Sequence, residues 1–443
     1  MVPALSIDDN PYPRRAHNRV IPLIDGHPFY ARLQQAFRAA RERIWAIVSF
    51  IEPAFSFADG TSWWDLLDEC SARGVEVRLL FWRNPAFFST AHVFQGDGQT
   101  RQWLDRRGTG FLARWDGSPD AGHCHHQKAF VIDAGQDDAI AFVGGMVLSR
   151  STLAWPGHEG PGKHDVFVEL MGPVVTDAIS NFIERWNHAS MDDAAPPYPD
   201  DMRAGDIARD AFAAPLPPAG EVPVQLSRTV RPGIYPSIPA GEDGIWRQYQ
   251  AAFRAARRTI YIENQHPGEL QLLRLMHEAL ARGVHIIQVV PEEPMGAIYD
   301  ERTRGPASPY AATFAWFERL REHDGFTLVG YAQGPTYRPV YVHAKVCIVD
   351  GEWVTCGSAN LVDLSLSRDH TELNAAFWHR PTGLAMLEAL LGEHGPLELS
   401  GGDDLVYLQR AASLARENAA RRSRGEPMRG LANALDPRTY ALR

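Results

Sequence analysis

The chain has 443 residues, of which 45% are hydrophobic and 22% are charged, as in an ordinary soluble folded protein. That composition excludes disorder and collagen-like repeats, and no apolar run approaches the ~20 residues of a membrane span. The net charge of −10 disfavours general binding to nucleic acid or anionic membranes, without excluding a local basic groove. Residues 1–10 lack the basic start and long apolar core of a signal peptide, so we expect a cytoplasmic protein.

The first predicted helix-to-strand unit recurs later in the chain. Phe37–Arg41 closes an amphipathic stretch and precedes the strand-like run Ile44–Ile51. The same five letters return at Phe253–Arg257, before the apolar run Ile260–Ile262. A single match of this kind also arises by chance among Ala- and Arg-rich helices.

A second repeat follows in the same order. Residues 72–75 (Ala-Arg-Gly-Val) recur as residues 281–284, and each copy ends a helical pattern and begins a strand. Glycine is the common residue just past a helix end. Two ordered matches predict a duplicated α/β fold made of two α-β-α lobes, related by a pseudo-two-fold axis, with the active site at their interface.

The segment between the repeats is rich in Pro and Ala and cannot sustain a helix or a central strand. We therefore expect an N-terminal lobe over 1–195, a linker over 196–222 and a C-terminal lobe over 223–400. Residues 401–443 are expected to form a surface helix and an Arg-rich tail.

The chemistry-bearing motif H-x-K-x4-D occurs twice, as His126–Asp133 and as His343–Asp350. Each is followed by a β-type apolar run, and residues i and i+2 of a strand face the same side. His126 should therefore project with Lys128, and His343 with Lys345. One such motif is weak evidence, whereas two placed by a duplication are strong.

Two His–Lys pairs that meet across a pseudo-two-fold axis suit a phosphodiester. One imidazole can attack phosphorus while the other protonates the leaving oxygen, and the lysine ammonium groups supply positive charge without a metal. A nucleophilic histidine works best when a carboxylate fixes its other ring nitrogen. Asp165 and Glu372 follow the motifs and are the candidates, with solvated strand-end carboxylates as the alternative. Gly144 and Gly145, and Ser358 with Asn360, offer close approach to a phosphate or, alternatively, ordinary tight turns.

These residues resemble the phospholipase D superfamily, whose hallmark is two H-x-K-x4-D motifs, and the resemblance covers about residues 18–396. The runs at 125–128, 261–265 and 164–173 look like the phospholipase D and cardiolipin synthase branches. The resemblance implies a phosphohistidine intermediate that passes to water or to an alcohol, with no cofactor and no metal.

The resemblance also implies residue roles. His126 would be the nucleophile and His343 the general acid/base. Asp165 and Glu372 would orient the histidines. The remaining roles are phosphate or substrate binding, for Lys128, Lys345, Asn360, Ser358, Gly144, Gly145 and Gln265, and structural support, for Asp133 and Asp350.

One departure from the family pattern concerns Val147, which stands where Asn or Asp is often found two residues after the second glycine. A phosphate contact is in doubt there, and Ser149 is a candidate substitute. Trp63-Trp64, Phe87-Phe88 and the Arg-rich tail are candidate membrane contacts, although paired aromatics are more often core.

Several readings stay open. The run His123–His126 could be a metal cluster, and His164 or His370 could line the site. The sequence predicts phospholipase D-type cleavage of a glycerophospholipid head group by a monomer that acts peripherally at a membrane. A cardiolipin synthase-like transferase and then a nuclease are the alternatives, and no nucleic-acid partner is expected because of the acidic charge.

Overall fold

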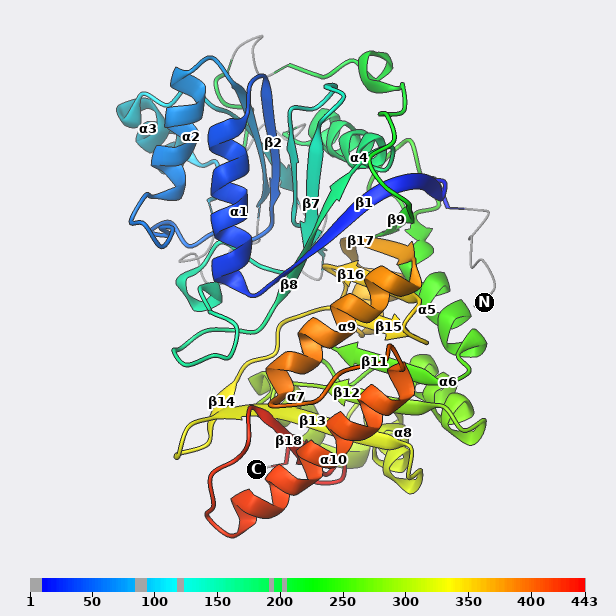
Figure 1. Ribbon diagram of the computed structural model, residues 1–443. Coiled ribbons are helices and arrows are strands. Elements are labelled where there is room, and N and C mark those ends of the chain that lie inside the picture. The colour runs from blue at the N-terminus through cyan, green and yellow to red at the C-terminus, as the bar shows by residue number, and fades with distance from the viewer. Residues whose placement is uncertain (1–9, 84–93, 118–122, 191–194, 201–204, 443) are drawn as a thin grey trace.

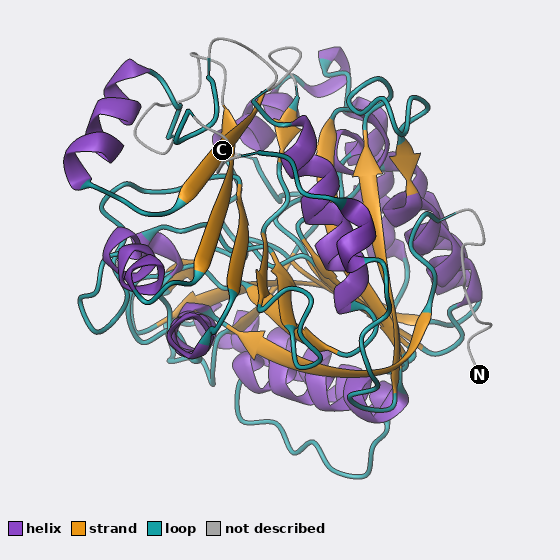
Figure 2. Cartoon of the chain, turned by 90° about the horizontal axis from the view of Figure 1, so that it is seen from above, coloured by secondary structure: helices purple, strands orange, loops and turns teal. Residues whose placement is uncertain are grey.

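The computed structural model describes residues 10–83, 94–117, 123–190, 195–200 and 205–442. Figure 1 shows two lobes, the first drawn from blue to green and the second from green to red. In each lobe a mixed sheet lies between helices, and Figure 2 shows the strands running through the middle of the molecule. The duplicated α/β architecture expected from the repeats is therefore what the chain adopts.

The first lobe has the strand order β4-β3-β2-β6-β7-β8-β1. Strands β2, β3 and β4 are parallel, and the others are antiparallel to their neighbours. The strand bounds are β1 (Arg15–Ile24), β2 (Arg43–Val48), β3 (Glu76–Arg83), β4 (Leu112–Gly117), β6 (Ala129–Ile132), β7 (Ile140–Gly144) and β8 (Val166–Met171). The helix bounds are α1 (Gly26–Ala39), α2 (Trp63–Ala72), α3 (Gly98–Arg107) and α4 (Val175–His188).

The second lobe repeats this order as β13-β12-β11-β15-β16-β17-β9. Its strand bounds are β9 (Val222–Val230), β10 (Glu242–Asp243), β11 (Thr259–Glu263), β12 (His285–Val289), β13 (Phe326–Gln333), β14 (Arg338–Val340), β15 (Val346–Val349), β16 (Trp353–Gly357), β17 (His370–Trp378) and β18 (Ala432–Leu435). Its helix bounds are α5 (Gly244–Ala255), α6 (Leu270–Ala281), α7 (Gly296–Thr303), α8 (Ala311–Arg319), α9 (Arg380–His394) and α10 (Asp404–Ser423).

The alternation of side chains along β2 explains why this sheet is covered on both faces. Ile44, Ala46 and Val48 join the core beneath α1 and α2, whereas Trp45 and Ile47 face the opposite way, toward α4. A strand places successive side chains on opposite faces, so a run that is apolar throughout needs cover on both. The core on the α4 side continues into the second lobe, which makes the two lobes one packed body.

The lobes are also joined through their backbones. Strand β1 pairs with β8 and, at Arg15 and Asn18, with β9 of the second lobe. The short strand β5 (Cys124–His125) runs parallel to the start of β17, and His164 forms a bridge with Val342. These contacts place both H-x-K-x4-D motifs at the lobe interface.

The C-terminal segment differs from the expected surface helix and tail. Helix α10 buries Tyr407, Leu408, Ala411 and Ala415 against the second lobe, and β18 then adds a strand beside β13. These buried side chains recur at helical spacing, so one face of α10 belongs to the core. Burial of that face is the physical reason why the segment is not a free tail.

The arginines of this segment are paired within the chain. Arg422 pairs with Glu292 and Arg424 with Glu426. Trp63 and Trp64 are buried in the core of the first lobe. Phe87-Phe88 lie outside the described residues.

Candidate active site

Both motif histidines lie just before a central strand, His126 before β6 and His343 before β15. Each is almost buried, with 8% and 9% of its surface exposed, respectively. Lys128 and Lys345 are buried beside them, and each ammonium group donates to the carbonyl oxygen of its own motif histidine. The structure thus brings each predicted His–Lys pair together at the beginning of its central strand.

The two carboxylates reach these histidines across the lobe interface. Nδ1 of His126, in the first lobe, lies 3.0 Å from Oε2 of Glu372, which is on β17 of the second lobe. Nδ1 of His343, in the second lobe, lies 2.5 Å from Oδ2 of Asp165, which precedes β8 of the first lobe. Each histidine is therefore oriented through Nδ1 by a carboxylate from the other lobe, and this contact leaves Nε2 unused.

Neighbouring groups hold these two carboxylates in place. Oγ of Ser358 donates to Glu372 and accepts from the backbone N–H of Leu373. Asp165 accepts from the N–H of Val166 at 2.8 Å. Ser358, which the sequence analysis grouped with substrate-binding residues, thus contacts the carboxylate that orients His126.

The two pairs differ in their protonation. Burial lowers the pKa of His126 to about 4, while the charges and hydrogen bonds of His126 and His370 hold the pKa of Glu372 well below its usual range. Burial raises the pKa of Asp165 to about 7 and lowers that of His343. Near neutral pH, His126 is therefore a free base, whereas the His343–Asp165 pair is close to taking up a proton.

The lysines are strongly perturbed as well. Burial lowers the pKa of Lys128 to about 8 and that of Lys345 to about 7, against the attraction of Glu372 and Asp165. Lys163 is partly buried nearby, over the ring of Tyr341. These cations are concentrated where a phosphate would need them.

Neither glycine of the site has room for a side chain. A Cβ on Gly144 would collide with the ring of Phe167, and one on Gly145 would collide with Oδ1 of Asp165 and lie 3.1 Å from Cδ of Lys345. Neither glycine has a positive φ. The position that the family often fills with Asn or Asp holds Val147, and Ser149 donates to Glu52 at 3.1 Å.

Two amides complete the expected set. Oε1 of Gln265 lies 3.4 Å from Nζ of Lys345. Asn360 is 6% exposed, and within the described parts of the chain its Oδ1 finds no hydrogen-bond partner. A buried amide oxygen without a partner is costly, and a bound ligand would relieve that cost.

Some residues at the site were missed or left open. His370 lies beside the site, with its ring 6.0 Å from that of His126 and Nδ1 3.7 Å from Glu372. The ring of Phe50 lies 6.1 Å from that of His126. Burial lowers the pKa of His266 to about 3, and the positive charge of Lys345 lowers it further. Phe50 and His266 follow the equivalent strands β2 and β11. The sequence repeat places both residues at matching positions and could have indicated that they lie at the site.

The run His123–His126 does not converge on one point. His123 contacts the carbonyl of Asp369, and His125 lies 3.1 Å from the carbonyl of Gly117. His126 faces Glu372 instead. The four cysteines are buried and free. Across the described ranges, the side chains close enough together to suit a metal are Asp25, His158 and His164, and none of these belongs to the run.

Asp133 and Asp350 play matching structural roles. The Asp133 carboxylate accepts the backbone N–H groups of residues 41–43, which lead into β2. The Asp350 carboxylate accepts those of residues 257–259, which lead into β11. Each motif aspartate therefore ties its motif to the repeated helix-to-strand turn.

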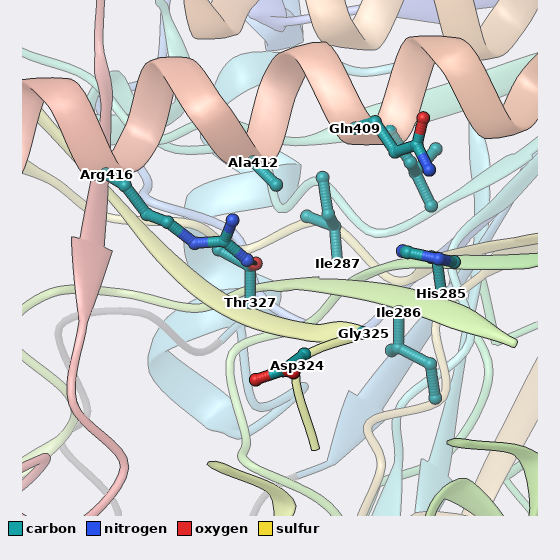
Figure 3. Close-up of a pocket in the computed structure, with 10 residues that line it drawn as sticks. His285, Ile286, Ile287, Asp324, Gly325, Thr327, Gln409, Ala412 and Arg416 are labelled. Carbon is teal, nitrogen blue, oxygen red and sulfur yellow. Dashed lines mark hydrogen bonds between the residues drawn. The ribbon is translucent and has the colours of Figure 1, made fainter. Parts of the chain in front are cut away.

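A small pocket of about 110 Å³ lies away from the motifs, between α10 and the strands β12 and β13. Figure 3 shows Arg416 above Thr327, and its guanidinium donates to the Thr327 hydroxyl at 2.9 Å. None of the lining residues belongs to the site described above.

Comparison with known proteins agrees with this geometry. Residues 249–388 match the family model described as "Cardiolipin synthase, PLD-like domain". Cardiolipin synthase B of Escherichia coli K12 is 26% identical over 372 residues, covering 80% of this chain and 75% of that protein. Phospholipase D A of Dictyostelium discoideum is 22% identical over 438 residues, covering 80% of this chain and 32% of that protein.

The fold has a solved counterpart in the phosphatidylserine synthase of Haemophilus influenzae. The two superpose with a TM-score of 0.55 at 15% identity, over 86% of this chain and 87% of that one. The likeness extends over both lobes of the duplicated α/β fold. The chain is similar to members of the phospholipase D superfamily in its two motifs, its fold and the relatives named above. None of the helices that the structure describes is long and apolar enough to cross a membrane.

Proposed function

We propose that the protein cleaves the head-group phosphodiester of a glycerophospholipid through a phosphohistidine at His126. The phosphatidyl group would then pass to water or to an alcohol. The observation that carries this proposal is the crossed arrangement of His126 with Glu372 and of His343 with Asp165. It supplies one free-base imidazole, His126, and one His–Asp pair, His343 with Asp165, that can hold a proton near neutral pH.

In the first step, Nε2 of His126 attacks phosphorus while Nδ1–H donates to Glu372. A P–N bond forms, and the bond between phosphorus and the head-group oxygen breaks. The His343–Asp165 pair gives its proton to that oxygen, so the head group leaves as a neutral alcohol function. The attack requires a neutral His126, which its lowered pKa supports.

In the second step, water or an alcohol attacks the phosphorus of the phosphohistidine. His343 takes the proton of the incoming oxygen, the P–N bond breaks and His126 returns to its free-base form. The His343–Asp165 pair thereby regains the proton that it lost in the first step. Water gives phosphatidic acid, and an alcohol gives a new phosphodiester.

The phosphate oxygens would lie against the lysines and amides of the site. Lys128 and Lys345 would neutralise the charge that develops on the non-bridging oxygens. Asn360 and Gln265 would add hydrogen bonds to these oxygens by donating from their amide N–H groups. No step of this scheme uses a metal.

A second candidate is transfer of the phosphatidyl group to a second phospholipid. It is favoured by the names of the relatives, which include cardiolipin synthase B, and by the description of the matching family model. The chemistry at His126 is the same, and only the acceptor differs. A nuclease is disfavoured by the net charge of −10.

The proposal includes a phospholipid presented at a membrane surface and a peripheral, monomeric enzyme. Monomeric action is supported because both half-sites come from one chain. Two intact H-x-K-x4-D motifs and their carboxylates need no second copy.

Mass spectrometry of the lipid products separates these possibilities. The purified protein would be incubated with vesicles of phosphatidylcholine, phosphatidylethanolamine and phosphatidylglycerol, with and without ethanol, beside its His126→Ala variant. Phosphatidic acid together with phosphatidylethanol supports the phosphohistidine route, and cardiolipin as the main product supports the transferase. No change in any lipid by the folded wild-type protein would overturn the proposal and direct the search to other phosphodiesters.

A further inference from the structure

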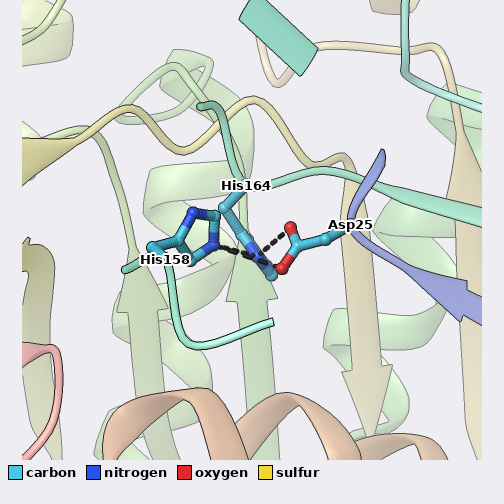
Figure 4. A group of neighbouring side chains, drawn as sticks. All are labelled: Asp25, His158 and His164. Atoms are coloured by element: carbon cyan, nitrogen blue, oxygen red, sulfur yellow. Dashed lines mark hydrogen bonds and ion pairs between the residues drawn. The ribbon is translucent and has the colours of Figure 1, made fainter. Parts of the chain in front are cut away.

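A buried charged cluster joins the two lobes next to the proposed site. Asp25 follows β1, His164 precedes β8, and Glu263 ends β11 of the second lobe. All three side chains are fully buried. Nδ1 of His164 lies 3.0 Å from Oδ1 of Asp25, and Nε2 lies 2.9 Å from Oε2 of Glu263. Figure 4 shows the first of these contacts, with His158 beside His164 and in contact with the same Asp25 carboxylate.

These contacts require His164 to carry a proton on both ring nitrogens. A carboxylate only accepts hydrogen bonds, so each nitrogen that faces one must donate. The imidazolium then stands between one carboxylate from each lobe. A buried charge is tolerated when it is paired and hydrogen-bonded in this way.

A metal ion is the alternative occupant, because the ligand atoms of Asp25, His158 and His164 lie close together. Nε2 of His158 is 3.2 Å from Oδ2 of Asp25 and 3.5 Å from Nδ1 of His164. A metal ion would have to bind the lone pair on Nδ1 of His164. That nitrogen instead carries a proton, which it donates to Asp25. The hydrogen-bonded imidazolium therefore accounts for more of the contacts.

The cluster holds the backbone on both sides of the His343–Asp165 pair. The N–H groups of His343 and Ala344 both donate to the carbonyl oxygen of His164, at 2.7 and 3.1 Å. The N–H of Asp25 donates to the carbonyl of Asp165 at 2.8 Å, and Oδ1 of Asp25 accepts from the N–H of Asp165 at 3.3 Å. A shift of His164 would move both members of the pair.

The second lobe holds Glu263 just as firmly. Its Oε1 accepts from the hydroxyl of Tyr261 at 2.5 Å, and Tyr331 approaches the same oxygen at 3.5 Å. Tyr261 also contacts His394 on α9. The sheet of the second lobe therefore fixes the position of Glu263, and Glu263 in turn fixes the position of His164.

We infer that the imidazolium of His164 is a positioning residue that, by joining Asp25 to Glu263 across the lobes, fixes His343 against Asp165 for proton transfer. The inference rests on the proposed function for its kinetic consequence. His164 touches no reacting atom in this scheme. Its loss should slow proton transfer through His343 by up to about 10²-fold, as for a misplacement of about 1 Å.

A substrate with an activated leaving group separates the two steps. The p-nitrophenyl ester of phosphatidic acid releases p-nitrophenolate without needing a proton, so formation of the phosphohistidine does not depend on His343. The later attack by water on the phosphohistidine still depends on His343. The His164→Asn and Glu263→Gln variants should show a burst of about one nitrophenolate per chain, followed by a slow steady state in which kcat and KM fall together. Glu263→Gln keeps the shape of the contact if His164→Asn fails to fold.

His277→Asn is the matched control. His277 also uses both ring nitrogens, toward His323 and the carbonyl of Trp316, but it lies on α6 within the second lobe. It should have wild-type kinetics. Steady-state rates in both cluster variants that equal those of this control would overturn the inference.

Two measurements keep the inference testable without activity. Nitrogen-15 NMR of histidine-labelled protein, with the His164 signals assigned by their loss in His164→Asn, should show both ring nitrogens protonated at neutral pH. A single protonated nitrogen, or one equivalent of tightly bound metal by elemental analysis that is absent from His158→Ala, would overturn it. If the wild-type protein acts on no phospholipid, the proposed function fails, and the NMR result alone decides whether His164 is an imidazolium.

Discussion

Gly145 and Asp165 lie so close together that residue 145 has no room for a side chain. A Cβ there would collide with Oδ1 of Asp165 and lie 3.1 Å from Cδ of Lys345. Since Asp165 orients His343, the fit of this glycine sets the geometry of the proposed acid/base group. It therefore links a backbone position in the first lobe to chemistry carried by the second.

Gly145→Ala should lower kcat by at least tenfold and destabilise the fold by about 1–3 kcal/mol, the usual cost of an added methyl group in a packed site. Urea unfolding and phospholipid turnover would measure the two effects. Gly392→Ala is the control, because Gly392 is exposed on α9 and has open space around its Cβ position. Wild-type turnover by Gly145→Ala would show that Asp165 does not need its observed place.

The rate of reaction should depend on pH in a bell-shaped way. Below about pH 4, His126 takes up a proton and can no longer attack. Above about pH 7, the Asp165–His343 pair loses the proton that the leaving group needs, and Lys345, whose pKa is also about 7, loses its charge. Both changes lower kcat/KM as pH rises. A profile of kcat/KM that keeps rising above pH 7 would contradict this assignment.

The two histidines should fail at different steps. His126→Ala removes the attacking nitrogen, so neither turnover nor a covalent intermediate should form. His343→Ala should still form the intermediate with a substrate such as the p-nitrophenyl ester and then stall, because no base activates the acceptor. Mass spectrometry of the intact protein would detect the added phosphatidyl group. An adduct on His126→Ala, with none on His343→Ala, would reverse the two roles.

The motif aspartates should affect stability without affecting chemistry. Asp350 has a φ of 54° and accepts three backbone N–H groups. Asparagine tolerates that conformation but lacks the charge, so Asp350→Asn should lose about 1.5–3 kcal/mol of unfolding free energy. Urea titration would measure the loss, with the same kcat expected per folded molecule. Asp137→Asn is an exposed control that should change neither quantity.

The sequence predicted the local parts of the site well. Spacing alone paired His126 with Lys128 and His343 with Lys345, and the repeats predicted the duplicated fold. Asp165 and Glu372 were predicted to orient the histidines, but not which carboxylate serves which histidine. That assignment depends on how the lobes dock, which no local pattern encodes.

Other features escaped prediction for physical reasons. Helix α10 was expected from its periodicity, but not the burial of one face, because that face is rich in alanine, whose small side chain gives only a weak apolar pattern. Asp25 stands before a helix and looks like an ordinary turn residue until the fold brings Glu263 from the other lobe to within reach of His164. Contacts between residues far apart in the chain are visible only in the folded protein.

The crossing of the carboxylates bears on the history of the protein. Neither lobe pairs its own histidine with its own carboxylate, because Glu372 contacts His126 and Asp165 contacts His343 across the interface. An ancestor with one lobe would have worked only as a pair of identical chains, with the same acid in both positions. Fusion of the two copies freed each position to mutate separately. A glutamate could then contact one histidine and an aspartate the other. The two equivalent positions in one chain thereby came to hold different carboxylates.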